Sequence, residues 1–148
     1  YTNGKNWKMP FKKIPIKSEW LQSGNKIAVV SVGPVADEVF RSIAELSFGD
    51  ELSHIDLKVI KPLDTKTIQR IFESHEHLLV VEDAAMSGSA ASALMEYKES
   101  LGSKVRIVQL GIPDAFVEHG SSEALRNKVR LDSESIATVL SEMHHSLT

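Results

Sequence analysis

Cysteine is absent from all 148 residues, and this absence rules out several classes of function. Without a thiol the chain can form no disulfide framework, no thiolate nucleophile and no cysteine zinc site. Long apolar runs are also missing, since none approaches the roughly 20 residues that span a bilayer. Residues 1–10 lack the apolar segment of a signal peptide, and a net charge of -3 provides no basic face for nucleic acid. We therefore expect neither a membrane nor a nucleic-acid partner, and a cytoplasmic location is compatible with these absences.

The residues that are present fit one compact domain. Hydrophobic residues make up 42% and charged residues 25% of the chain, as in ordinary globular proteins. The first residue is Tyr1 and not methionine, from which we expect further polypeptide before it. Ile14-Pro15-Ile16 indicates an edge strand or an extended arm, because proline cannot donate to a central ladder. We predict that residues 1–24 are a linker and edge segment from a preceding domain, and that residues 25–148 form the domain.

Strand and helix patterns alternate along residues 25–148. Short apolar runs rich in β-branched residues are typical of buried strands, and they occupy residues 27–32, 55–60, 78–81 and 105–110. The intervening patterns predict five helices. The first begins near Pro34, and the second is capped by Asp64. The third follows the turn at residues 87–92, the fourth spans residues 122–128, and the fifth begins at Asp132. This alternation predicts an α/β fold with three layers, α/β/α, in which helices cover both faces of a mostly parallel sheet.

Ligand sites in such folds lie beyond the carboxyl ends of the strands, so the residues after each strand are the candidates. Gly33-Pro34 lacks the further glycines of a dinucleotide fingerprint and a Walker lysine, and it fits a strand-to-helix turn better. Lys61 could meet an anion, but Lys61-Pro62-Leu63-Asp64 is better explained as a proline turn into an Asp-capped helix.

Glu82 and Asp83 end the third predicted strand, and two acids there could bind magnesium or act as general acid and base. Adjacent strand residues point to opposite faces, however, so the two carboxylates would not converge. We therefore favour an interface or turn-stabilising role. The small residues at 87–92 could accept an anion at a helix N-terminus, but close packing against a neighbour is the interpretation that we favour.

The six histidines show no metal-binding pattern. His75 and His77 are two residues apart and would not share a helical face, and His144 and His145 are consecutive near the end of the chain. His119 lies in a promising loop, but no Ser-His-Asp or Cys-His partner can be assigned to it. From the residues alone we predict no catalytic, cofactor-binding or metal-binding residue.

Several motifs, in order, resemble those of the C-terminal domain of 1-deoxy-D-xylulose-5-phosphate synthase, in the transketolase superfamily. Residues 61–64 match KPLD, residues 80–83 and 88–92 resemble the family's V-E-E/D and G-G-x-G-S turn, and residues 111–120 resemble G-I/L-P-D-x-F-I/V-E-H-G. The first two are shared with transketolase and the β subunit of pyruvate dehydrogenase, whereas the third points to the synthase branch. The candidate motif or interface residues are therefore Lys61, Pro62, Asp64, Glu82, Gly88, Pro113, Asp114, Glu118, His119 and Gly120.

The resemblance implies a five-stranded sheet with one antiparallel edge strand. Family members condense pyruvate with glyceraldehyde 3-phosphate through a thiamine-diphosphate carbanion, supplying isoprenoid precursors and thiamine. Thiamine diphosphate and magnesium are held by two preceding domains, so no cofactor is expected in this chain, which would be inactive alone. Its partners would be those domains and the second subunit of a homodimer. The alternatives are the equivalent domain of a transketolase or ketoacid dehydrogenase, and a stand-alone small-molecule-binding domain.

Four residues depart from the family pattern. Ser89 and Ala91 replace glycines of the turn, which adds bulk where a backbone normally packs closely. Arg130 stands where glycine is usual before Leu131-Asp132. Asn3 takes the place of an arginine that, in the family, lies near the substrate phosphate.

Overall fold

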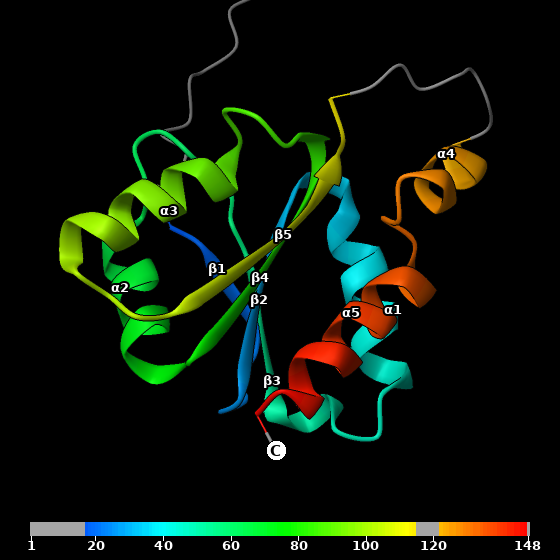
Figure 1. The fold of residues 1–148 in the computed structure, drawn as a ribbon, viewed down its shortest axis with the longest axis horizontal. Coiled ribbons are helices and arrows are strands. Elements are labelled where there is room, and N and C mark those ends of the chain that lie inside the picture. Colours follow the sequence, from blue (N-terminus) through cyan, green and yellow to red (C-terminus); the bar gives the residue numbers. More distant parts are fainter. Residues whose placement is uncertain (1–16, 115–121, 148) are drawn as a thin grey trace, which may run out of the picture.

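The computed structural model describes residues 17–114 and 122–147, and it shows a five-stranded sheet between two pairs of helices (Figure 1). The strands are β1 Glu19–Gln22, β2 Ile27–Val32, β3 Leu52–Asp56, β4 His77–Ala85 and β5 Arg106–Ile112. The helices are α1 Ala36–Glu45, α2 Thr65–Ser74, α3 Ala90–Leu101, α4 Ser122–Lys128 and α5 Ser133–His145.

The strand order is β1-β3-β2-β4-β5, and only the β1–β3 pair is antiparallel. The central strand β2 fixes the register, since Ile27 is level with Leu52 on one side and with His77 on the other. Helices between parallel strands are what this topology requires, because a parallel neighbour can only be reached by a crossover. The predicted three-layer fold, with a mostly parallel sheet and one antiparallel edge strand, is confirmed.

Alternation along the strands divides the interior into two cores. Ile27 and Val29 of β2 face α1 and α5, whereas Ala28 and Val30 face α2 and α3. Figure 1 shows these helix pairs on opposite sides of the sheet. Because β2 is buried on both faces, its sequence is almost continuously apolar.

Side-chain caps fix where the helices begin. Asp64 accepts a hydrogen bond from the backbone N–H of Thr67, and Asp132 accepts one from the N–H of Ser135. These bonds satisfy N–H groups that have no partner within the helix. The predicted helix starts at Asp64 and Asp132 are confirmed.

One strand lies elsewhere than predicted. The strand expected at residues 55–60 is found at Leu52–Asp56, because its first half carries the polar Ser53 and His54 and therefore lacks an apolar pattern. The antiparallel edge strand is Glu19–Gln22, while Ile14-Pro15-Ile16 lies outside the described residues. Within residues 17–114 and 122–147, no helix is both long and apolar enough to span a bilayer.

Candidate functional site

Glu82 lies at the carboxyl edge of the sheet, the position where this fold class places ligands. It is near the end of β4 and only 1% exposed. Its Oε2 accepts the backbone N–H of Ala90 at 3.0 Å, and its Oε1 accepts from Nε2 of Gln109 at 3.5 Å. The carboxylate therefore stabilises the first turn of α3, where a negative charge is favourable.

Asp83 points to the other face of the sheet, as strand alternation requires. Its side chain is 35% exposed, and its Oδ2 lies 4.0 Å from Nη2 of Arg126 in α4. Arg126 also donates to Oε1 of Glu38 at 3.2 Å, and Arg41 donates to the same oxygen at 3.1 Å. This small ion network links α4, α1 and β4. The two neighbouring acids thus serve different elements, and they do not form a magnesium pair.

The turn after β4 packs against β5 of the same chain. Gly88 has φ +70°, a left-handed conformation that favours glycine. A Cβ on Gly111 of β5 would lie only 3.1 Å from the carbonyl oxygen of Ala84, so the two strands approach closely there. Ser89 caps α3 by accepting the N–H of Ser92, and its hydroxyl also accepts from Gln109 at 2.8 Å. The serine that departs from the family's glycine is therefore a helix cap in this chain.

The KPLD segment connects β3 to α2. Lys61 and Pro62 are exposed, and the peptide bond between them is cis. Asp64 is partly buried and accepts the backbone N–H of Ser18 at 2.9 Å in addition to that of Thr67. Burial raises the pKa of Asp64, but the hydrogen bonds from Ser18 and Thr67 outweigh it and leave the pKa below its usual range.

The third motif is only partly described by the structure. Pro113 and Asp114 follow β5 directly and are exposed at the carboxyl edge of the sheet. Glu118, His119 and Gly120 lie outside the described residues, as does Asn3. Their expected roles remain predictions.

Two buried serine–histidine pairs were not found by sequence reasoning. Oγ of Ser31 lies 2.9 Å from Nε2 of His54, and Oγ of Ser53 lies 2.9 Å from Nε2 of His75. Burial lowers the pKa of His54 to about 4, although the charge of Asp56 opposes this shift. Burial also lowers the pKa of His75. All four side chains are at most 6% exposed, and the pairs satisfy polar groups inside the domain.

The part of the chain that the structure describes offers no group of three His, Asp or Glu side chains that could hold a metal ion. The carboxylate of Glu82 is already engaged by two N–H donors. The α3 N-terminus is engaged as well, since Glu82 and Ser89 accept the N–H groups of Ala90 and Ser92. The described residues therefore do not fit a magnesium ion or a diphosphate at this edge of the sheet.

Residues 17–136 match the family of transketolase C-terminal domains, and the chain belongs to this family. The chain is 32% identical over 140 residues to the 1-deoxy-D-xylulose-5-phosphate synthase of Bacteroides fragilis, a match that covers 93% of this chain and 22% of that protein. It is 34% identical over 139 residues to the synthase of Parabacteroides distasonis, covering 92% of this chain and 22% of that protein. The resemblance to the synthase branch is thereby confirmed.

A solved structure shares the fold. It is described as a split gene transketolase, inactive beta4 tetramer, and it matches with a TM-score of 0.80 at 19% identity, over 89% of this chain and 43% of that chain. At this identity the match shows the fold alone. The chain spans about a fifth of the length of these synthase relatives.

Proposed function

We propose that this chain is the C-terminal structural and dimerisation domain of a thiamine-diphosphate-dependent 1-deoxy-D-xylulose-5-phosphate synthase. The observation that carries the proposal is the match to the Bacteroides fragilis synthase, which extends over 93% of this chain but only 22% of the relative. The parent enzyme would condense pyruvate with glyceraldehyde 3-phosphate and release carbon dioxide, in the cytoplasm.

The geometry of the carboxyl edge supports a scaffolding role. Glu82 and Ser89 are engaged in hydrogen bonds within the domain, and Asp83 lies beside Arg126. Thiamine diphosphate and magnesium would accordingly be held by other domains of the parent. This chain would supply a packed body against which those domains lie.

The apolar side chains of edge strand β5 support the presence of an interface on this domain. Its apolar residues Ile107, Val108, Leu110 and Ile112 are only partly buried, and nearby Met86 is 37% exposed. An apolar sheet edge is normally covered in a folded protein. We infer that preceding domains or the second subunit of a homodimer cover it.

A domain exchange tests the function. In the Bacteroides fragilis synthase, the matching region is replaced by this chain, and synthesis of 1-deoxy-D-xylulose 5-phosphate from pyruvate and glyceraldehyde 3-phosphate is measured. We expect at least a tenth of the parent activity. The matched control carries the corresponding region of a transketolase and should be inactive. A chimera that folds and dimerises but has no activity would contradict the proposal.

A binding assay separates this proposal from a stand-alone ligand-binding domain. The melting temperature of the 148-residue chain is measured with and without thiamine diphosphate and magnesium. We expect no ligand-dependent shift, because the described residues lack the donors for these groups. A saturable rise at micromolar concentrations would count against the assignment.

A further inference from the structure

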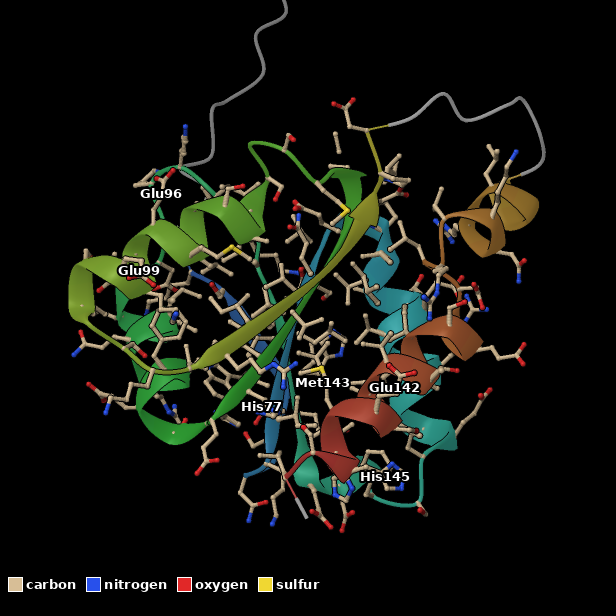
Figure 2. All side chains as sticks on the ribbon, in the orientation of Figure 1. His77, Glu96, Glu99, Glu142, Met143 and His145 are labelled. Carbon is tan, nitrogen blue, oxygen red and sulfur yellow. The ribbon has the colours of Figure 1, made fainter. Side chains whose placement is uncertain are left out.

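The amino ends of three adjacent strands border an open groove of about 870 Å³. His77 at the start of β4 is level with Ile27 of β2 on one side and with Arg106 of β5 on the other. In Figure 2, His77 lies at the lower end of β4, whereas the turn from β4 into α3 lies at the upper end. The groove is therefore separate from the carboxyl edge that carries Glu82 and the motif residues.

Three cationic side chains line this groove from two strands. Lys26 precedes β2, Lys104 precedes β5 and Arg106 begins β5. All three are exposed, and no carboxylate within the described ranges lies at ion-pair distance from any of them. Because β2 and β5 flank β4, the sheet order places positive charge on both sides of one opening.

The positive charge that lines the groove exceeds the negative charge. Glu73 and Glu76 are its two acids, and Oε1 of Glu73 accepts a hydrogen bond from Gln69 at 2.8 Å. His75 and His77 also line the groove. Nε2 of His75 is paired with Ser53, whereas the buried Nδ1 of His77 has no hydrogen-bond partner among the described residues. Three cations of the groove thus stand against two carboxylates.

Apolar side chains complete the lining. Phe72 and Val105 are 9% and 3% exposed, and Leu147 is half-buried. The volume of the groove lies within the roughly 300–1,000 Å³ of small-molecule sites, and most of its lining is polar. Lysine and arginine together favour phosphate oxygens, the first as a point charge and the second through paired N–H donors.

We propose that this groove binds a small organic phosphate. The phosphate would lie among Lys26, Lys104 and Arg106, and the apolar part of the ligand would lie against Phe72, Val105 and Leu147. The site is independent of the proposed synthase function, because it lies at the other edge of the sheet and uses none of the motif residues.

Phenyl phosphate serves as the probe, because it carries both a dianion and an apolar ring. Amide spectra of the ¹⁵N-labelled chain are recorded at low salt during titration with phenyl phosphate and, separately, with inorganic phosphate. We expect saturable shifts at amides that line the groove, with inorganic phosphate binding there at least threefold more weakly. Shifts that do not saturate, that spread over the surface, or that are equal for both probes would overturn the proposal.

Paired variants separate the groove from general surface charge. Lys104→Gln with Arg106→Gln should weaken phenyl phosphate binding at least tenfold. Lys17→Gln with Lys66→Gln removes the same charge from exposed lysines that do not line the groove, and should change binding less than twofold. Equal weakening by both pairs would contradict the proposal. If the first pair disturbs the spectrum of the folded chain, Lys26→Gln with Lys104→Gln gives the same comparison.

Discussion

Arg130 is a residue in a backbone conformation that suits glycine. Its φ is 61°, and it follows the end of α4. The N–H of Arg130 donates to the carbonyl of Asn127, and the N–H of Leu131 donates to the carbonyl of Arg126. This is the hydrogen-bond pattern of a Schellman helix end, whose left-handed residue is usually glycine. The departure noted in the sequence, arginine in place of glycine, therefore falls on the one position of this turn where a side chain is unfavourable.

Arg130→Gly should consequently stabilise the domain. The left-handed conformation costs a non-glycine residue about 1–2 kcal/mol, and the greater backbone entropy of glycine in the unfolded chain offsets part of this gain. We expect a rise of about 1 kcal/mol in the free energy of unfolding, measured by urea denaturation. Arg130→Ala keeps the strained backbone and should leave stability nearly unchanged. A gain with alanine equal to that with glycine would show that the side chain, and not the backbone, is responsible.

Glu82 and Asp83 should differ in their contribution to stability, although they are adjacent. Glu82→Ala leaves the buried N–H of Ala90 without its acceptor, and we expect a loss of about 2 kcal/mol in urea denaturation. Asp83→Ala affects a side chain that is 35% exposed, and its effect should stay within about 0.5 kcal/mol. Similar losses for both variants would contradict the hydrogen-bond roles described above.

His54 should make stability fall in mild acid. Burial lowers its pKa from 6.5 to about 4, so between these values the unfolded chain binds a proton that the folded chain excludes. Stability is therefore lost as pH falls through this window, by about 2 kcal/mol between pH 7 and pH 5. The buried His75, whose pKa is also lowered, adds a loss of the same sign.

The pH effect of His54 is isolated by substitution. His54→Gln can keep a hydrogen bond to Ser31, and it should reduce the stability difference between pH 7 and pH 5 by about 2 kcal/mol. Lys66→Gln, on the exposed surface of α2, is the control and should retain the full difference. An unchanged pH dependence in His54→Gln would show that His54 is protonated in the folded state.

At the residue scale, the sequence was sufficient to predict side-chain directions that depend on strand geometry alone. Alternation of side chains along β4 predicted that Glu82 and Asp83 diverge, and they do. It failed for Ser31 and His54, which are 23 residues apart and meet across two paired strands. Their contact depends on the register of β2 against β3, which the sequence of neither strand specifies.

At the scale of elements, Asp64 holds together two segments that are distant in sequence. It caps α2 through Thr67, and it accepts the N–H of Ser18 immediately before β1. Asp64→Ala should therefore loosen β1 as well as α2. We expect the amides of β1 to exchange with solvent about tenfold faster relative to those of β2, because the edge strand loses its anchor while the central strand does not.

The cap of α5 provides a matched control for Asp64. Asp132 also caps its helix through a backbone N–H and has no bond to β1. Asp132→Ala should cost about 1 kcal/mol and leave the exchange ratio of β1 to β2 unchanged. A change of the ratio in both variants would mean that β1 responds to overall stability alone.

Strands could be placed from the sequence where an apolar local pattern coincides with burial in the folded domain. β2 is Ile27–Val32 as predicted, because a strand buried on both faces is almost continuously apolar. β3 was placed three residues late, because its buried Ser53 and His54 are compensated by hydrogen bonds to distant partners. No local pattern reveals such compensation, and apolar Val59 and Ile60 beyond the strand drew the prediction toward them.

At the scale of the whole molecule, the two cores share their central strands. β2 and β4 contribute to both, through alternate side chains. The core beneath α1 and α5 therefore cannot open without disturbing the strands that also bury α2 and α3. This arrangement predicts a single cooperative unfolding transition and not two separate ones.

Two equivalent substitutions on opposite faces test this cooperativity. Ile136→Val lies in the core beneath α1 and α5, and Ile68→Val in the core beneath α2 and α3. Each should cost about 1 kcal/mol. Unfolding is followed by far-ultraviolet circular dichroism and by fluorescence of Trp20, which packs against the second core, in a Trp7→Phe background. Because one transition exposes both cores, each substitution should lower the two midpoints equally. If Ile136→Val lowers the circular dichroism midpoint but leaves the Trp20 midpoint in place, the two faces unfold separately and the shared strands do not couple them.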